Sequence, residues 1–474
     1  MEFEPVIGLE VHTQLKTKSK IFCNCSTEFG KPPNTQVCPV CLGYPGVLPV
    51  MNEDVVRRAI KTSLMMHFKI NRFNKMDRKN YFYPDLPKAY QISQYDQPIG
   101  ICGKVTIMTE TGPKDIRITR VHMEEDAGKL MHGESGSLVD FNRTGVPLLE
   151  IVSEPDIFSS GDAYLYLKKI KQILEYGDIS DCNMEEGSLR CDANVSVRPK
   201  GETKLGTKTE IKNVNSFRYV QKAIDFEIER QIQVIKEGGR VVQETRLFDA
   251  STGKTRTMRS KEEAHDYRYF PEPDLAPIVI SDALIEEIRK EMPEHPDDKA
   301  ARFVSQYGLS AYDASLLTAV LLTANYFEEC AKLCSNYKLI SNWMMSELTR
   351  ELNNRNLTAA QSPITPKALA ELINLIENGK ISGKIAKDVL PLMFESGKSA
   401  SAIVEEKGLT VISDTGALEK VIQDVLQSNQ QIVADFKGGK EKAMGALVGQ
   451  VMKATKGKAS PQLVNELLKK ALTA

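Results

Sequence analysis

Met292-Pro-Glu-His-Pro-Asp-Asp298 divides this chain of 474 residues into two parts with different residue patterns. Two prolines beside polar residues are typical of a break between regular elements. Upstream, short β-rich runs alternate with Gly, Pro, Asn and Asp, whereas the downstream part is rich in Leu, Ala, Glu and Lys. The stretch therefore predicts a boundary between a sheet-rich domain and helical domains.

The upstream part reads as sheet and loop with a few helices, so we expect an α+β fold. Alternating or β-rich runs predict strands at residues 6–12, 105–108, 115–121, 193–198 and 209–212. Apolar residues at helical spacing predict helices at residues 54–67, 160–176 and 216–236.

The downstream part predicts helices at residues 369–376, 385–394 and 399–405, and its composition changes again near Glu405-Glu-Lys-Gly408. A chain of this length is expected to form roughly three domains, at about 150 residues each. We therefore predict a sheet-rich domain at residues 1–293, a helical domain at 294–406 and a small helical tail at 407–474.

Charge and composition exclude several classes of protein. With 41% apolar and 26% charged residues, the chain is neither disordered nor a membrane protein in composition. Neither a signal peptide nor an apolar run long enough for a bilayer is present, so a cytoplasmic protein is expected.

The net charge of -1 argues against indiscriminate coating of nucleic acid, but residues 436–474 hold eight lysines and two glutamates. This segment suits phosphates, although a solvated helical face would look the same.

Four of the nine cysteines form two closely spaced pairs, Cys23-Asn-Cys25 and Cys38-Pro-Val-Cys41. Four thiolates at this spacing can surround Zn²⁺ tetrahedrally on two knuckle-like turns. Because four thiolates leave no open coordination position, such a zinc would be structural. The alternative is four buried free cysteines.

Carboxylates gather around a histidine in the strand-like segments. Glu10 and His12 are two residues apart on one predicted strand, so both side chains face the same side of the sheet. His122-Met-Glu-Glu-Asp126 and Glu150 add further acidic groups. Together they predict a seat for Mg²⁺ that holds the phosphates of a nucleotide, although each could equally be a solvated or salt-bridged surface group.

Several known phosphate-binding and hydrolase signatures are missing from the sequence. There is no G-x-x-x-x-G-K-[ST] motif, no G-x-G-x-x-G motif after a strand, and no G-x-S-x-G elbow. If ATP is used, metal and side chains must hold its phosphates. Loops dense in aromatic and polar residues, above all 80–94, are suited to ligand contact, although packed surface loops can have this composition too.

Long ordered strings carry a much more specific signal, and they extend over essentially the whole chain. They are Val6-Ile-Gly-Leu-Glu-Val-His12, Tyr44-Pro-Gly-Val-Leu-Pro49, Tyr81-Phe-Tyr-Pro-Asp-Leu-Pro-Lys88, His122-Met-Glu-Glu-Asp-Ala-Gly-Lys129, Asp140-Phe-Asn-Arg-Thr-Gly-Val-Pro-Leu-Leu-Glu-Ile-Val152, Arg190-Cys-Asp-Ala-Asn-Val-Ser196, Glu210-Ile-Lys-Asn-Val-Asn-Ser216 and Asp266-Tyr-Arg-Tyr-Phe-Pro-Glu-Pro-Asp-Leu275. In these strings the chain resembles the B-subunit family of aspartyl/glutamyl-tRNA amidotransferases.

The resemblance implies a mostly antiparallel, cradle-shaped catalytic domain, followed by an all-helical domain and a small tail. It also implies a reaction in which ATP and Mg²⁺ phosphorylate the side-chain carboxylate of Asp-tRNA(Asn) or Glu-tRNA(Gln), after which ammonia displaces phosphate. The implied catalytic and Mg²⁺-binding residues are Glu10, His12, Glu124, Glu125 and Glu150. Residues implied to line the cradle for substrate or ATP are Tyr81, Lys88, Asn142, Arg143, Arg190 and Asp192.

Partners are implied in the same way. An amidase A subunit would release ammonia from glutamine and send it through an internal channel, and a small C subunit would hold the two larger subunits together. The helical and tail domains would hold the misacylated tRNA(Asn) or tRNA(Gln), and a nondiscriminating aminoacyl-tRNA synthetase would be a further partner. The lysines expected to contact tRNA are Lys437, Lys440, Lys442, Lys453, Lys456 and Lys458. No contact with a membrane is expected.

Two other functions are compatible with parts of the pattern. The chain could be a noncatalytic tRNA-binding scaffold whose acidic group is structural. It could also be a zinc-bearing ligase that acts alone, which would need its own ammonia source. The sequence holds no cysteine–histidine glutaminase pattern and no evident Ser-Lys arrangement, so we expect dependence on a partner for ammonia.

Overall fold

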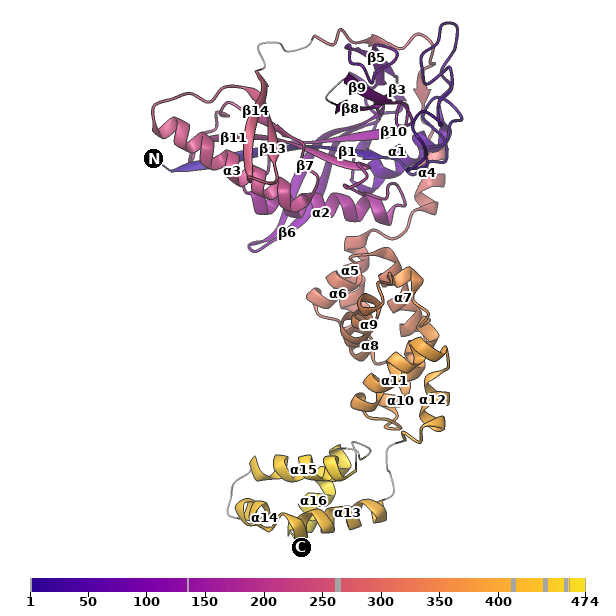
Figure 1. Cartoon of the computed structure of the whole chain (residues 1–474), viewed down its shortest axis with the longest axis vertical. Coiled ribbons are helices and arrows are strands. Elements are labelled where there is room, and N and C mark those ends of the chain that lie inside the picture. Colours follow the sequence, from indigo (N-terminus) through magenta and orange to yellow (C-terminus); the bar gives the residue numbers. More distant parts are fainter. Residues whose placement is uncertain are drawn as a thin grey trace. The chain divides into compact units, whose positions relative to one another are not determined.

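The computed structural model describes residues 2–133, 136–260, 266–410, 415–437, 442–455, 459 and 461–473. The chain separates into two compact units, Met1–His295 and Pro296–Ala474, and each is described by itself (Figure 1). This boundary lies close to the proline-containing stretch. The three domain ranges drawn from the sequence stay predictions.

A nine-stranded sheet forms the centre of the first unit. In spatial order the strands are β14 (Lys254–Ser260), β13 (Glu244–Asp249), β12 (Thr209–Lys212), β11 (Leu189–Pro199), β1 (Phe3–Gln14), β10 (Pro147–Ser153), β7 (Gly112–Glu125), β6 (Gly100–Thr109) and β2 (Lys69–Ile70). All neighbouring strands pair antiparallel except β12 and β13, so the expected α+β class and mostly antiparallel sheet are confirmed. The five predicted strands lie within β1, β6, β7, β11 and β12.

The two faces of this sheet have different environments. On β1, Leu9, Val11 and Thr13 are fully buried, whereas the alternating Glu10 and His12 are partly exposed. The period of two thus separates an apolar face from a polar one. The polar face is the one that carries the candidate site.

Three helices cover the apolar face, and they agree with the three predicted upstream helices. They are α1 (Glu53–Met65), α2 (Ser160–Tyr176) and α3 (Phe217–Lys236). The side chains of Asn52, Ser159 and Ser216 cap their N-termini. α2 packs on β6 and α3 on β11, and Figure 1 shows both lying along one side of the sheet.

A buried ion cluster fastens α3 to the sheet. The Glu227 carboxylate accepts hydrogen bonds from the Thr209 hydroxyl on β12 (2.7 Å) and from the Arg230 guanidinium (2.6 Å), and it lies 3.4 Å from the Arg246 guanidinium on β13. Burial opposes the charge of Glu227, but these partners outweigh burial and lower its pKa below the usual value.

Glu227→Gln is therefore expected to destabilise the chain by about 2–4 kcal/mol at neutral pH, because the buried Arg246 and the partly buried Arg230 lose one of their two acidic partners. The folded-state pKa lies below the unfolded value of about 4.3, so this stability is complete above that pH and is lost as pH falls through the folded-state pKa. Thermal melts of both proteins at about pH 7 and about pH 3.5 measure the effect. An equal difference in melting temperature between wild type and Glu227→Gln at the two pH values would contradict this account of Glu227.

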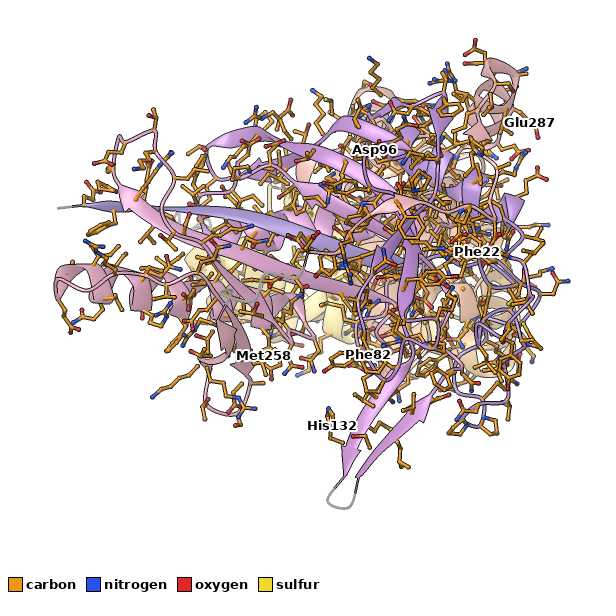
Figure 2. The ribbon with its side chains drawn as sticks, turned by 90° about the horizontal axis from the view of Figure 1, so that it is seen from above. Phe22, Phe82, Asp96, His132, Met258 and Glu287 are labelled. Atoms are coloured by element: carbon orange, nitrogen blue, oxygen red, sulfur yellow. The ribbon has the colours of Figure 1, made fainter. Side chains whose placement is uncertain are left out.

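Small sheets flank the main one. They pair β15 (Phe270–Pro271) with β4 (Asp77–Asn80) and β5 (Tyr90–Ser93), β16 (Ile278–Val279) with β3 (Phe73–Asn74), and β8 (Lys129–Gly133) with β9 (Gly136–Asp140). Figure 2 shows the β8–β9 ribbon, marked by His132, extending away from the rest of the unit. The helix α4 (Asp282–Glu291) packs on α1, where Arg57 lies 2.6 Å from Glu287.

The second unit is helical, and its described part contains two separate hydrophobic cores. One joins the elements between Phe303 and Val404, and the other those between Leu418 and Leu472. The elements are α5 (Pro296–Tyr307), α6 (Ala311–Leu317), α7 (Leu321–Ala331), α8 (Tyr337–Trp343), the π-helical turn η2 (Met344–Leu348), α9 (Thr349–Asn354), the 3-10 turn η3 (Ala359–Gln361), α10 (Pro366–Glu377), α11 (Gly383–Ser396), α12 (Ala400–Glu406), α13 (Thr415–Ser428), α14 (Gln430–Lys437), α15 (Lys442–Ala454) and α16 (Pro461–Thr473).

The three helices predicted in the downstream part lie in α10, α11 and α12. None of the helices in the described ranges combines the length and apolar character that crossing a membrane requires.

Candidate functional site

A row of polar side chains crosses four strands on the polar face of the large sheet. His12 on β1 lies opposite Glu150 on β10, and Glu150 lies opposite His122 on β7. On the other side, His12 lies opposite Arg190 on β11. Directly opposed residues share a face of the sheet, so this register brings together groups that are up to 178 positions apart in sequence.

Glu124 completes a compact cluster with His12 and Glu150. His12 Nε2 lies 3.2 Å from Glu150 Oε2 and 3.9 Å from Glu124 Oε1. One ligand atom from each of the three residues lies within 4.8 Å of the others. Both carboxylates are buried, so the cluster has the donor set and the spacing to hold a cation.

The charges of this cluster act strongly on one another. Burial and the nearby Glu150 raise the pKa of Glu124, whereas His122 and His12 overcome burial and lower the pKa of Glu150. Burial opposes the charged form of His12, but its bond to Glu150 raises its pKa, and burial lowers the pKa of His122 to about 4. A divalent cation would stabilise both carboxylates as anions.

A second acidic group faces the same side of the sheet. Ligand atoms of Glu10, Asp192 and Glu210 lie within 4.8 Å of one another. Lys212 forms ion pairs with Asp192 and with Glu210 (3.1 Å), which partly offset the negative charge. Glu10 was predicted to share a site with His12 but belongs to this group. The prediction from sequence did not include Glu210, although Glu210 begins one of the family-like strings.

Glu125 does not join either group. It is adjacent to Glu124 on β7, so strand alternation directs it to the opposite face. There it forms an ion pair with Lys88 and accepts the Ile92 N–H (2.9 Å). Both charged residues line a small cavity of about 70 Å³ beside Cys23 and Cys41. Strand alternation therefore separates Glu125 from the other four expected ligands, and a catalytic role of Glu125 stays a prediction.

Three of the residues predicted to line the cradle hold its loops in place. Arg143 donates to the backbone carbonyl of Ala127 (2.9 Å), and the Asn142 side chain accepts the Gln36 N–H (2.8 Å). Tyr81 donates its hydroxyl to the Gln91 side chain (3.1 Å).

Arg190 belongs to the row itself. Its guanidinium donates to Asp126 (2.8 Å), and its buried Nε has no hydrogen-bond partner among the described residues. The Asp126 charge, outweighing burial, raises the pKa of Arg190. Because Arg190 lies beside His12, this free donor is available to an anion at the row.

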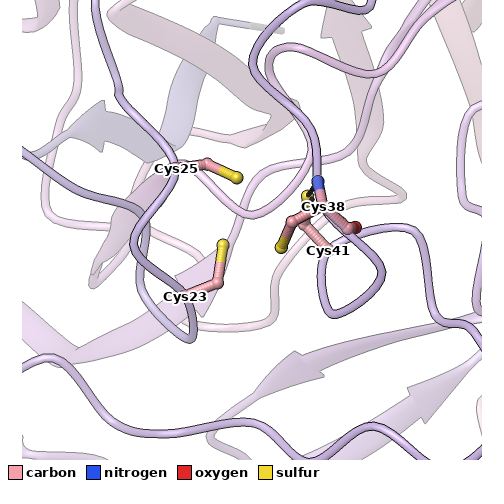
Figure 3. Close-up of side chains that lie close together, drawn as sticks. All are labelled: Cys23, Cys25, Cys38 and Cys41. Carbon is pink, nitrogen blue, oxygen red and sulfur yellow. Dashed lines mark hydrogen bonds between the residues drawn. The ribbon is translucent and has the colours of Figure 1, made fainter.

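The four expected cysteines come together (Figure 3). One Sγ atom from each of Cys23, Cys25, Cys38 and Cys41 lies within 4.8 Å of the others, which makes a group able to bind a metal. The Cys38 N–H (3.2 Å) and the Lys20 ammonium (3.6 Å) both donate to Cys41 Sγ. These donors are typical of the outer shell around a metal-bound thiolate.

The predicted tRNA-binding lysines are only partly described. Lys453 lies in the last turn of α15. Lys437 ends α14 and Lys442 begins α15, but their side chains lie outside the described part of the chain. Lys440, Lys456 and Lys458 lie outside the described residues altogether.

Comparison with known proteins agrees with this division of the chain. Residues 5–286, which hold every residue of the row and of both acidic groups, match the model of the GatB/GatE catalytic domain. Residues 325–472 match the model of the GatB domain. The chain belongs to the GatB/GatE family. The resemblance seen in the motifs is thereby confirmed.

Three relatives that match over their full length share the same protein name. The chain is 58% identical over 474 residues to the B subunit of the aspartyl/glutamyl-tRNA(Asn/Gln) amidotransferase of Caldanaerobacter subterraneus subsp. tengcongensis, with all of both chains covered. The proteins of the same name from Moorella thermoacetica and Geotalea uraniireducens are 58% and 57% identical, again with complete coverage of both chains. No part of these relatives' length is therefore missing from the alignment.

Proposed function

We propose that this chain is the B subunit of a glutamine-dependent tRNA amidotransferase. It activates the side-chain carboxylate of Asp-tRNA(Asn) or Glu-tRNA(Gln) with ATP and transfers ammonia to the activated carbon, giving Asn-tRNA(Asn) or Gln-tRNA(Gln). The single observation that carries the proposal is the full-length match to amidotransferase B subunits at 57–58% identity. The cluster of His12, Glu124 and Glu150 inside the matched catalytic domain supports it.

The His12, Glu124 and Glu150 side chains are proposed to hold Mg²⁺. Two buried carboxylates suit this hard cation, and the imidazole adds a third donor. His12, Glu124 and Glu150 would hold the cation, whose positive charge would offset the negative charge that develops on the phosphoryl group during its transfer. Glu10 is proposed to act with Asp192 and Glu210 as the neighbouring acidic group.

The remaining residues of the row would position the substrates. Arg190 is proposed to direct its unpaired Nε toward an anionic oxygen, while Asp126 fixes the orientation of its guanidinium. In the first step, the side-chain carboxylate of the substrate attacks the γ-phosphorus of ATP, which forms an oxygen–phosphorus bond and releases ADP. Ammonia then attacks the carbonyl carbon, phosphate leaves, and the amide nitrogen loses a proton.

The cysteine group is proposed to hold a structural zinc ion. Tetrahedral Zn–S bonds of about 2.3 Å require sulfur atoms about 3.8 Å apart, and the four Sγ atoms approach this spacing. Four thiolates would fill the coordination sphere, so zinc would stabilise residues 20–49 and take no part in the chemistry.

Ammonia is proposed to come from an amidase A subunit, with a small C subunit in the same complex. The relatives are named as one subunit of an amidotransferase, which supports a complex of several subunits. The lysines of the tail are proposed to contact tRNA phosphates, with residues 1–293, 294–406 and 407–474 acting as three domains. A nondiscriminating synthetase would supply the misacylated tRNA, and this substrate would place the reaction in the cytoplasm.

Reconstitution tests the proposal. The chain, copurified with its A and C subunits, is expected to convert Glu-tRNA(Gln) or Asp-tRNA(Asn) to the amidated product only when ATP, Mg²⁺ and either glutamine or ammonium are present. Product formation is measured by separating the amino acids released from tRNA. Amidation that proceeds without ATP would contradict the proposal, as would a complex that lacks this chain and is equally active.

A further inference from the structure

Lys79, on β4, carries a charge that no described group neutralises directly. Within the part of the chain that the structure describes, its ammonium has neither a hydrogen bond nor an ion pair. Its nearest recorded contacts are two aromatic rings, with Nζ 5.0 Å from the Tyr267 centroid and 5.9 Å from the Tyr81 centroid. Cation–π contact of this kind holds an ammonium without using its three N–H donors.

The position of Lys79 is fixed relative to the catalytic row. On the neighbouring strand β5, Gln91 lies opposite Lys79 and donates its side-chain N–H to the backbone carbonyl of Glu125 (2.6 Å). Ser93, also on β5, donates its hydroxyl to the Glu124 carboxylate (3.4 Å). The strand pair β4–β5 is thereby attached to the end of β7 that supplies Glu124.

The negative charges of Glu124 and Glu150 act on Lys79. Burial opposes its charge, but the carboxylates of Glu124 and Glu150 raise its pKa above the usual value. The ammonium is therefore charged at neutral pH. Burial raises the pKa of Tyr269 to about 12, so this neighbouring ring is uncharged and adds no negative charge beside Lys79.

Aromatic packing keeps the Lys79 side chain from turning away. Tyr81 meets Tyr267 edge to face with centroids 5.8 Å apart, and Tyr267 meets Tyr269 in the same manner at 6.0 Å. Tyr269 stacks on Tyr95 at 4.2 Å. These rings come from three separate segments and form an aromatic wall, two of whose rings contact the Lys79 ammonium.

Other described cations near the row each have a carboxylate partner, including Arg120, which lies 3.8 Å from Glu150. Lys88 pairs with Glu125, Lys212 with Asp192, and Arg190 with Asp126. Once a divalent cation neutralises Glu124 and Glu150, Lys79 would lose the negative field that compensates it. An unpaired ammonium in a partly buried site is costly, so the site then favours an incoming anion.

We propose that Lys79 forms a subsite for the γ-phosphoryl group of ATP and contacts an oxygen of that group as it passes to the substrate carboxylate. This role rests on the proposed function. The aromatic wall holds the ammonium in place, and the phosphoryl oxygens supply the hydrogen-bond acceptors that the described part of the protein does not provide. The assignment makes Lys79 a catalytic residue that the motif-based prediction did not include.

Nucleotide binding to the intact complex tests the subsite separately from the reaction. Dissociation constants of ADP and of the nonhydrolysable β,γ-imido analogue of ATP are measured with Mg²⁺ present for wild type, Lys79→Gln and Lys79→Arg. Loss of a charge-assisted hydrogen bond is expected to weaken binding of the analogue to Lys79→Gln by about 10- to 100-fold. Binding of ADP is expected to change by less than about 3-fold, because ADP lacks the group that Lys79 contacts.

Control variants distinguish a direct contact between Lys79 and the γ-phosphoryl group from a structural effect of the substitution. Lys79→Arg keeps the charge and is expected to retain most of the discrimination between the two nucleotides. Lys104→Gln removes an exposed lysine on β6 that pairs with Asp115 and is expected to bind both nucleotides as wild type does. A melting temperature equal to that of wild type would show that Lys79→Gln leaves the aromatic wall intact.

Three results would overturn the assignment. Equal weakening of both nucleotides by Lys79→Gln would show a structural role, and unchanged binding of the analogue would show that Lys79 does not reach the γ-phosphoryl group. A normal affinity for the analogue together with a raised KM for Glu-tRNA(Gln) would assign Lys79 to the substrate carboxylate. Failure of the wild-type complex to bind either nucleotide would instead contradict the proposed function itself.

Discussion

Replacing Glu150 by glutamine is expected to lower the rate of ATP-dependent amidation by about 10²- to 10⁴-fold. Glu150 lies at the centre of the row, where its carboxylate is 3.2 Å from His12 Nε2 and 3.5 Å from His122 Nε2. Glutamine keeps the shape of the side chain but removes a negative charge and a strong ligand. The cation that orients the phosphates would then bind weakly, and positioning is the main contribution to phosphoryl transfer.

The loss should appear in cation binding as well as in turnover. Mn²⁺ bound to the complex, counted by electron paramagnetic resonance, is expected to fall in Glu150→Gln under conditions that saturate wild type. Glu154→Gln is the matched control, because Glu154 follows the same strand and accepts a hydrogen bond from Thr119 away from the row. Activity of Glu150→Gln within about 3-fold of wild type would be too small an effect for the loss of a ligand that orients the phosphates.

Cys41→Ser is expected to release the metal of the cysteine group and to lower the melting temperature by about 10 °C or more. Cys41 is buried, and its sulfur accepts hydrogen bonds from the Cys38 N–H (3.2 Å) and the Lys20 ammonium (3.6 Å). Lys20 is fully buried and also donates to the Gln36 carbonyl oxygen (2.7 Å), so the group connects two separate turns. The segment is mostly irregular, so without the metal these turns would be held mainly by single hydrogen bonds such as those of Lys20 and Gln36.

Zinc content and melting temperature measure this effect together. Wild type is expected to contain one zinc ion per chain by elemental analysis. Cys102→Ser is the control, since Cys102 is exposed and lies outside the cysteine group. Wild-type protein without zinc, or a Cys41→Ser variant that keeps both its zinc and its melting temperature, would contradict a structural metal at this position.

Local periodicity predicted the parts of the site that lie on one strand. Glu10 and His12 were expected to share a face, and they do. The same rule, applied to the adjacent Glu124 and Glu125, would have directed these side chains to opposite faces. Grouping the acidic and histidine residues into one site, first from their positions and then from the resemblance, did not take this alternation into account.

Long-range register could not be predicted from the sequence. His12 and Glu150 meet because β1 and β10 pair in one particular alignment, although 138 positions separate them. Glu210 and Lys79 were missed for the same reason, since each approaches a residue from a distant segment: Glu210 lies near Glu10, and Lys79 lies near the Tyr267 ring. The motifs located the acidic strings correctly, but only the pairing of strands shows which side chains share a cluster.

The overall architecture could be predicted from the sequence more fully than the site. The proline-containing stretch contains the boundary between the two units, which falls after His295. The predicted strands and helices depend on patterns of two and of 3.6 residues, which burial on one face imposes directly on the sequence. The tRNA-binding role of the tail depends on a partner and on side chains outside the described residues, so it stays a prediction.

The most direct test of the central claim is ADP formation by the complex in the presence of ammonium, with the glutaminase of the A subunit inactivated. Ammonium replaces the function of the A subunit, so the remaining ATP chemistry reports on this chain. We expect ADP to form with Glu-tRNA(Gln) in wild type, and we expect little ADP with uncharged tRNA or with the Glu150→Gln variant. ADP formation that is equal for charged and uncharged tRNA, or equal in wild type and variant, would contradict a carboxylate-activating site on this sheet.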